Sequence, residues 1–392
     1  LPFGQQADGL VPAEGAVVVG LKRLADAVAH GDEILGVIRG IGLSNDGSAG
    51  GLLSPDSAGQ VRAIRQAYAN AAIDPAEISF VECHATGTLL GDGIELASLR
   101  EVFGGDKPLA IGSLKSNMGH LLAAAGGAGL LKVLAALKHD EFLPNADCGS
   151  LRSELATGSL ELIQQVRPWQ RQSAPRKAAI SAFGFGGCNA HMIVEEWQPT
   201  QTKKRVVSTP ANLKLTRSVS EGDSARDLQT PSLTLRVSDS VLQQPLAIVG
   251  LAAQVSTGRD AADFLAGLLG TVASDASPQP MRSIQLEARG LRFPPQDLRR
   301  ALPQQLAVLK VAMDAVRSVK LPKERTGAFV GMQVDAQATR FGLNDARTVD
   351  PAKDMESGVP SVDSAIVLGT MPNIPANRIN IQLDLRGPGF TV

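Results

Sequence analysis

The stretch ISFVECHATGTLLGDGIELASLREVFGGDKPLAIGSLKSNMGH, residues 78–120, decides the fold. Its first apolar run, 78–82, predicts a strand that ends in a glycine-containing turn, and residues 91–103 predict a helix. A second strand at 109–112 leads into a second glycine-containing turn. This alternation is typical of an α/β protein, in which functional residues lie in loops at the strand ends.

The alternation continues on both sides of this stretch. Further strands are predicted at 16–19, 34–41, 178–182, 192–196, 246–250 and 327–331. Further helices are predicted at 60–72, 119–138, 261–269 and 303–319. Residues 198–244 are rich in Ser, Thr, Gln and Pro, and they predict a linker between two α/β regions.

Composition limits the classes of partner. The 392 residues carry 38 basic and 39 acidic side chains, so the formal net charge is -1. The one compact basic run, 203–205, is interpreted as a solvated linker patch, and no nucleic-acid partner is expected. The apolar run 121–137 is rich in alanine and interrupted by glycines, so we expect it to be too short and too weakly apolar to span a membrane.

The cysteines and the N-terminus indicate the compartment. Cys83, Cys148 and Cys188 are odd in number and lack CxxC spacing, which favours neither a disulfide framework nor a zinc site. A reducing, cytoplasmic location is therefore expected. The chain begins at Leu1 without a signal pattern, and we interpret it as a fragment of a longer protein.

Two histidines stand in the glycine-containing turns that follow the strands 78–82 and 109–112. His84 follows Glu82 and Cys83, and His120 ends the segment KSNMGH. Either could be a structural histidine, but two in equivalent turns favour a catalytic pair. His120 precedes an Ala/Gly helix whose N-terminal dipole should disfavour a charged imidazole, so we expect neutral N–H donors.

Other residues leave alternatives open. The run FGFGGCNAH, 183–191, is either an ordinary hairpin turn or a turn that presents a backbone N–H to a developing oxyanion. Cys83 beside His84 could suggest a thiol nucleophile, although adjacent strand residues point to opposite faces. A zinc site from Cys83, His84, Cys188 and His191 is conceivable but lacks ordinary ligand spacing, and no metal is expected.

These motifs together resemble the C-terminal half of a β-ketoacyl synthase of the polyketide synthase type. The resemblance runs collinearly through residues 1–197: GLSNDG at 42–47, CHATGT at 83–88, GSLKSNMGH at 112–120, AAAGGAGLLK at 123–132 and SAFGFGGCNAH at 181–191. Ala85 stands where glycine is more usual in the family. The resemblance implies a thiolase-like fold with α-β-α-β-α layers.

The resemblance also implies the reaction and its residues. The reaction is a decarboxylative Claisen condensation in which a cysteine upstream of Leu1 carries the acyl chain and a malonyl thioester supplies the nucleophilic carbon. Both thioesters are delivered on the phosphopantetheine of an acyl carrier protein, and no cofactor is bound directly. The implied catalytic residues are His84, His120 and Lys115. Phe185 is implied for the oxyanion hole and as a gate, and the implied substrate-binding residues are Thr86, Thr88, Asn117 and Gly186.

Residues 245–392 resemble the N-terminal half of a second synthase domain. The resemblance begins at PLAIVG, 245–250, and continues through RTGAFVG at 325–331 and NIPANRI at 373–379. The order of the two regions and the run MPNIPANR, 371–378, suggest a synthase followed by a chain-length factor, as in polyunsaturated fatty acid synthases. Pairing as a pseudo-heterodimer or homodimer is then expected. The alternatives are a noncatalytic scaffold and tandem active synthases of a modular polyketide synthase.

Overall fold

The computed structural model describes most of the chain. The described residues are 1–46, 54–105, 108–156, 158–184, 187–199, 245–255, 259–260, 262, 266, 284–287, 289–299, 301–332, 374–386 and 389–391. The predicted linker 198–244 and the predicted helix 261–269 therefore fall almost entirely outside the described residues.

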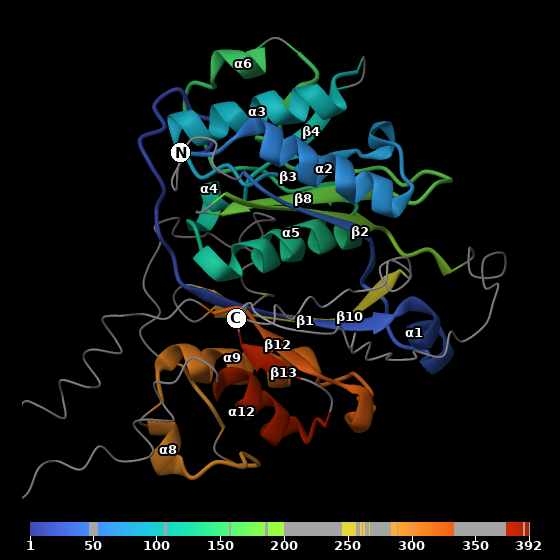
Figure 1. Cartoon of the computed structure of the whole chain (residues 1–392), viewed down its shortest axis with the longest axis vertical. Coiled ribbons are helices and arrows are strands. Elements are labelled where there is room, and N and C mark those ends of the chain that lie inside the picture. The colour runs from blue at the N-terminus through green and yellow to red at the C-terminus, as the bar shows by residue number, and fades with distance from the viewer. Residues whose placement is uncertain are drawn as a thin grey trace, which may run out of the picture.

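The described elements stack in five alternating layers, as predicted (Figure 1). From one side to the other, the layers are α2 (Ser57–Ala71) with α3 (Leu89–Phe103), a sheet that contains β2 (Gly36–Asn45), β3 (Phe80–Glu82) and β8 (Lys177–Gly184), α5 (Ala125–His139), β1 (Gly15–Arg23) with β10 (Leu246–Val255), and α9 (Pro303–Ala315) with α12 (Ile374–Leu383). The strands predicted at 16–19, 34–41, 78–82 and 246–250 and the helices predicted at 60–72 and 91–103 are confirmed as parts of these elements.

The main sheet has the order β1-β10-β2-β9-β8-β3-β4-β6. Its parallel pairs join β3 to β4 (Leu109–Gly112) and to β8, and β4 to β6 (Leu160–Leu162). Strand β9 (Cys188–Glu195) is antiparallel to both β8 and β2. Because β3, β4 and β8 are parallel, the turns that follow β3 and β4 lie at the same edge of the sheet, which brings the two histidine turns together.

The remaining elements are short. They are α1 (Leu24–His30), η1 (Pro75–Glu77), α4 (Lys115–Met118), η2 (Leu122–Ala124), β5 (Glu141–Phe142), α6 (Ser153–Ala156), β7 (Arg167–Pro168), β11 (Arg259–Asp260), α8 (Pro295–Arg299), η5 (Lys323–Arg325), β12 (Ala328–Val330) and β13 (Gly389–Thr391). Strand β12 pairs in parallel with β13. The sequence pattern does not predict most of these elements, because segments of two to seven residues carry too little periodicity.

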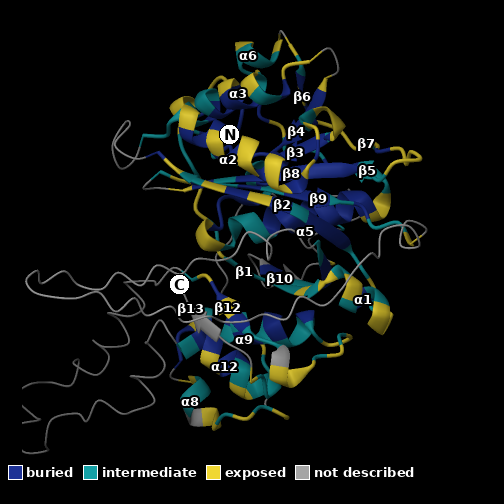
Figure 2. Ribbon diagram, turned by 45° about the vertical axis from the view of Figure 1, so that its right-hand side comes forward, coloured by how far each residue is buried: buried dark blue, intermediate teal, exposed yellow. Residues whose placement is uncertain are grey.

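The sheet is buried on both faces between α5 and the α2/α3 layer. Successive residues of β3 enter different cores: Phe80 packs into the cluster around α5, whereas Val81 packs into the cluster under α2 and α3. The same alternation places Ile180 of β8 beside α5 and Ala179 on the opposite face. Figure 2 shows the buried residues gathered along this sheet and on α5. Strands that are covered on both faces consist of uninterrupted apolar residues, and this pattern allowed them to be predicted from the sequence.

Helix α5 begins later than the predicted helix 119–138. The backbone of His120 is held by the segment before β1: its N–H donates to the Val11 carbonyl at 2.7 Å, and its carbonyl accepts from the Ala13 N–H at 2.9 Å. Leu122 then has φ 52°, in the left-handed region. The short 3-10 helix η2 (Leu122–Ala124) follows, and the α-helix begins only at Ala125, so the prediction of the helix start was wrong.

The segment 122–139 meets the length and composition criteria for a membrane-spanning helix, with a mean hydropathy of 1.2. The expectation that this run is too short and too weakly apolar was therefore wrong. In the structure, 56% of the segment is buried within the protein, where α5 forms the middle layer (Figure 1). Burial between two layers of strands accounts for its apolar composition.

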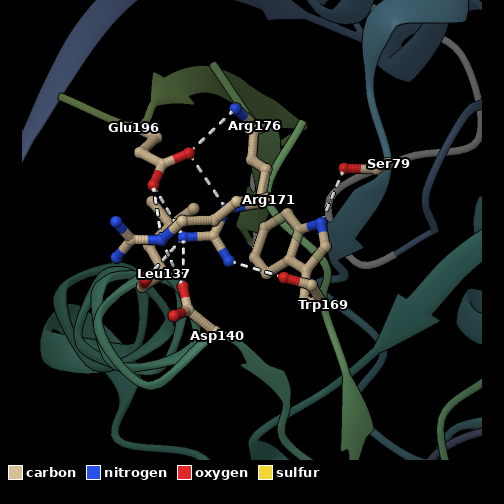
Figure 3. Close-up of polar contacts among 7 residues, drawn as sticks. All are labelled: Ser79, Leu137, Asp140, Trp169, Arg171, Arg176 and Glu196. Carbon is tan, nitrogen blue, oxygen red and sulfur yellow. Dashed lines mark hydrogen bonds and ion pairs between the residues drawn. The ribbon is translucent and has the colours of Figure 1, made fainter. Parts of the chain in front are cut away.

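A charged network holds the C-terminal end of α5 against the sheet (Figure 3). Arg176, directly before β8, donates to the Leu137 carbonyl at 2.7 Å and to the Trp169 carbonyl at 2.7 Å, and pairs with Glu196 at 2.8 Å. Asp140 ends the helix and accepts from Arg171 at 2.8 Å. The guanidinium of Arg176 thus satisfies one of the carbonyl groups that a helix leaves unpaired at its C-terminus.

Candidate active site

A cavity of about 700 Å³ opens where the turns after β3 and β4 meet the start of α5. Its walls come from both histidine turns, from the first turn of α3, from the hairpin between β8 and β9, and from the first residues of α5. His84, His120, Lys115, Thr86 and Thr88 all line it. The structure therefore brings together five of the eight residues selected from the sequence.

The turn that carries His84 is held by two carboxylates of α3. Glu95 accepts from the backbone N–H groups of His84 at 2.8 Å and Ala85 at 2.7 Å. Asp92 accepts from the N–H groups of Thr86 at 3.1 Å and Gly87 at 3.2 Å. Asp92 and Glu95 are spaced i, i+3 and so lie on one face of the helix. This spacing was the available signal for a role that was not predicted from the sequence.

The tautomer of His120 follows from a backbone hydrogen bond. The N–H of Leu122 donates to Nδ1 of His120 at 3.0 Å. Because Nδ1 accepts, the neutral ring carries its proton on Nε2, which makes Nε2 a hydrogen-bond donor. The His84 and His120 rings lie edge to face, with their centroids 5.4 Å apart, inside the cavity lining. Two imidazoles are thus available to act on one small group.

Both imidazoles are neutral at pH 7. Burial lowers the pKa of His84 well below 6.5, and the charges of Lys115 and His120 lower it further. Burial, followed by the charge of Lys115, lowers the pKa of His120 to about 4. Neutral rings were expected from the sequence, but the effect on His120 was assigned to the dipole of a helix beginning beside it. That reason was wrong, because α5 begins only at Ala125.

Lys115 lies beneath the His84 turn. Its Nζ donates to the carbonyl of Cys83 at 3.4 Å. Burial lowers the pKa of Lys115, while the carboxylates of Glu82 and Glu95 oppose this shift. Burial also raises the pKa of Glu95 to about 7. These contacts place a cation next to both imidazoles, which disfavours a further positive charge on either ring.

A buried ion pair underlies both turns. Glu82 and Lys132 lie 2.9 Å apart, with side-chain exposures of 2% and 0%. Glu82 also accepts from the backbone N–H of Leu114 at 2.5 Å, directly before Lys115. The pair therefore links the end of β3, the start of α4 and the middle of α5. It was not predicted from the sequence, because residues 82 and 132 are distant in the chain and no local pattern joins them.

The residues predicted to bind substrate or to form the oxyanion hole do not all lie at the cavity. The hydroxyl oxygens of Thr86 and Thr88 lie 3.4 Å apart at the cavity wall. Asn117 is not part of the cavity lining, and its amide donates to the Pro144 carbonyl at 3.3 Å. The structure thus does not bring Asn117 to the other site residues, and its role in substrate binding stays a prediction. Phe185 and Gly186 lie outside the described residues.

Cys83 does not form a nucleophile with His84. Cys83 is buried, and its thiol donates to the Val81 carbonyl at 3.6 Å. Burial raises the pKa of this thiol well above 9, so it stays protonated. Cys188 lines the cavity, whereas His191 is buried beside Ser181, with its Nδ1 3.0 Å from the Ser181 hydroxyl. Among the described residues, no three His, Cys, Asp or Glu side chains are grouped as metal ligands.

His191 gives a prediction about acid stability. Burial lowers its pKa to about 3 in the folded protein, whereas the pKa of an unfolded histidine is about 6.5. The folded state therefore retains this contribution above pH 6.5 and loses it as pH falls from 6.5 towards 3, with a slope of up to about 1.4 kcal/mol per pH unit. His191→Gln should remove this slope. The free energy of unfolding of both proteins, measured with urea at pH 7, 5 and 4, tests this. If it fell equally with pH in the two proteins, the assignment would be contradicted.

The alternating layers and the large mixed sheet are those of a thiolase-like ketosynthase fold. Residues 35–148 match the β-ketoacyl synthase C-terminal domain family, residues 144–228 match the ketoacyl-synthetase C-terminal extension, and residues 274–392 match the β-ketoacyl synthase N-terminal domain family. The chain therefore contains β-ketoacyl synthase domains. It carries the C-terminal domain before the N-terminal one.

Known relatives include large polyketide synthases, of which the chain spans only a small part. The chain is 42% identical to polyketide synthase GfsA of Streptomyces halstedii over 214 residues. This matched stretch covers 53% of this chain and 3% of that protein. It is 44% identical over 198 residues to a mycocerosic acid synthase-like polyketide synthase of Mycobacterium tuberculosis, covering 50% of this chain and 9% of that protein. A solved ketosynthase from module 6 of the bacillaene synthase of Bacillus subtilis is 39% identical, with a TM-score of 0.48, and covers 50% of this chain and 37% of its own.

Proposed function

We propose that residues 1–197 supply the decarboxylating half of a β-ketoacyl synthase that acts on malonyl groups carried by an acyl carrier protein. The observation that carries this proposal is the pair of neutral imidazoles at the cavity, His84 and His120, with their ring centroids 5.4 Å apart. Matches to both ketosynthase domain families support the same activity.

The chemistry follows from where charge develops. When the malonyl group loses carbon dioxide, the electron pair of the broken C–C bond becomes an enolate whose negative charge lies largely on the thioester oxygen. N–H donors from His84 and His120 stabilise this oxygen more strongly in the transition state than in the ground state. The enolate carbon then attacks the acyl thioester, forming a C–C bond while the C–S bond breaks and a thiolate leaves.

The surrounding residues support this step. Glu95 and Asp92 hold the backbone of the His84 turn, and the Leu122 N–H keeps the proton of His120 on Nε2. In this proposal, Thr86 and Thr88 contact the phosphopantetheine, and Phe185 serves the oxyanion hole and the tunnel gate. In this proposal, the acyl chain is carried by a nucleophilic cysteine in the N-terminal half of the same synthase, a different segment from residues 245–392.

The pH dependence of carbon dioxide release tests this proposal. Because the pKa of His120 is about 4, the neutral donor persists as pH is lowered from 8 to 5, and the rate should stay nearly constant over this range. The measurement is release of labelled carbon dioxide from malonyl-acyl carrier protein by the full-length protein. The carboxyl of Glu95, whose pKa is about 7, is removed by Glu95→Gln as a control. A fall of the rate with an apparent pKa between 6 and 7 that persists in Glu95→Gln would indicate a titrating base and would overturn the role assigned to the neutral rings.

The finer assignment concerns the product and the second domain. Tandem order and the run 371–378 support a polyunsaturated fatty acid synthase in which residues 245–392 begin a chain-length factor, pairing with the first domain as a pseudo-heterodimer in the cytoplasm. The alternative is a modular polyketide synthase with a second active ketosynthase. Mass spectrometry of the full-length protein after incubation with an acylated carrier protein distinguishes these two alternatives. A chain-length factor should acquire no acyl adduct, whereas a second active ketosynthase should acquire one.

A further inference from the structure

Segment 3–13, which precedes β1, contacts both histidine turns, the first after β3 and the second after β4. The N–H of Gly9 donates to the carbonyl of Gly87, in the first turn, at 2.9 Å. The carbonyl of Val11 accepts from the N–H of His120, in the second turn, at 2.7 Å. One short stretch of backbone thus bonds directly to both turns, and its two contact points are two residues apart.

The segment approaches both turns closely, because each turn has a glycine with a positive φ at the contact. Gly87 has φ 86°, and an added Cβ there would lie 2.9 Å from the Gly9 carbonyl oxygen. Gly119 has φ 81°, and an added Cβ there would lie 2.8 Å from the Val11 carbonyl oxygen. A side chain at either glycine would push segment 3–13 away from the turn, so both glycines allow the backbones to meet.

A buried carboxylate of α3 also holds the segment at the first turn. Oδ2 of Asp92 accepts from the Phe3 N–H at 2.8 Å, whereas its Oδ1 accepts from the Gly87 N–H at 3.2 Å. Phe3 is fully buried and packs in the core under α2 and α3. Segment 3–13 and the first turn therefore share one buried anchor, and separating them would cost this carboxylate a hydrogen bond.

A proline limits the freedom of the chain between and beyond the two contacts. Pro12 fixes its own φ and disfavours helical geometry at Val11, which keeps the backbone extended. Pro12 also forms a parallel β-bridge with His120, and the Ala13 N–H donates to the His120 carbonyl at 2.9 Å. Two residues of extended chain span about 6 to 7 Å. This length is comparable to the 5.4 Å between the ring centroids of the two histidines.

We propose that segment 3–13 is a positioning element for decarboxylation, in which residues 9–11 act as a spacer that fixes the separation of the two imidazole donors. This inference rests on the proposed function. Two N–H donors can act on one enolate oxygen only when they converge on it, and a misplacement of about 1 Å can lower a rate by about 100-fold. The spacer acts through the backbones of the two turns.

Lengthening the spacer tests this role. Insertion of one glycine between Leu10 and Val11 of the full-length protein should lower kcat for carbon dioxide release from malonyl-acyl carrier protein by about 100-fold and leave KM unchanged. Acyl transfer to the nucleophilic cysteine should persist, because the imidazoles act on the malonyl thioester. The matched control inserts one glycine between Gln5 and Gln6, which are both exposed. This control lengthens segment 3–13 outside the spacer and should retain the unmodified kcat.

A second variant keeps the chain length unchanged. Pro12→Gly removes no N–H donor and no side chain of the cavity lining, because proline has no N–H and Pro12 is exposed outside the lining. Pro168→Gly is the matched control, since Pro168 is exposed in β7 and also lies outside the lining. Both substitutions free the unfolded chain and should lower the urea midpoint similarly. Pro12→Gly alone should lower kcat for carbon dioxide release, by about tenfold.

The possible outcomes separate this inference from the proposed function. Equal kcat values for the two insertion variants, or for the two proline variants, would overturn the spacer and leave the proposed function standing. An equal fall of carbon dioxide release and acyl transfer in Pro12→Gly would show damage to the whole site and would also overturn the spacer. If the unmodified protein released no carbon dioxide, the proposed function would fail, and this inference with it.

Discussion

Replacing His84 or His120 by alanine should reduce the rate of carbon dioxide release from malonyl-acyl carrier protein by about 100- to 1000-fold. Each substitution removes one N–H donor from the developing enolate oxygen while leaving the backbone of its turn in place. The Glu95 carboxylate bonds the backbone, not the ring, of His84, and the His120 backbone is fixed by its bond to the Val11 carbonyl. The loss should therefore appear in the decarboxylation rate rather than in folding.

The measurement pairs two assays of the full-length protein. Acyl transfer from an acyl carrier protein to the nucleophilic cysteine should persist in both variants, because the histidines act on the malonyl thioester. His30→Ala is the matched control, since His30 is exposed at the end of α1, outside the cavity lining, and should leave both rates unchanged. Normal carbon dioxide release by either active-site variant would remove that histidine from the proposed reaction.

Lys132→Met should destabilise the protein by about 3 to 5 kcal/mol. The substitution leaves the carboxylate of Glu82 buried without its cation, and an uncompensated buried charge costs more than the pair contributes. Methionine keeps most of the side-chain volume, so a cavity adds little. Urea unfolding monitored by tryptophan fluorescence measures the loss.

The double variant Glu82→Gln with Lys132→Met should recover a large part of this loss. The glutamine carbonyl oxygen can still accept from the Leu114 N–H, whereas the unpaired charge is gone. Lys138→Met is the matched control, because Lys138 is exposed on the same helix. If the single and double variants were equally unstable, the cost would lie in packing around α5 rather than in the isolated charge of Glu82.

The sequence predicted the chemistry of the site through its local motifs. His84 and His120 each follow a strand in a glycine-containing turn, and parallel strands bring such turns to one edge of a sheet. The pattern could not predict how the rings stay neutral. The Leu122 N–H reaches Nδ1 of His120 across a bend in the backbone, and the His120 end of this bend is held by hydrogen bonds to the segment before β1.

By itself, the sequence determined the α/β class, the histidine turns and the positions of the long elements, since each depends on periodicity or on residues close together in the chain. Tertiary structure alone decided three features. It joined Glu82 to Lys132, brought the Leu122 N–H to Nδ1 of His120 and inserted β10 between β1 and β2. These contacts link residues far apart or on separate elements, and their energies arise from burial and complementary packing, which local patterns do not encode.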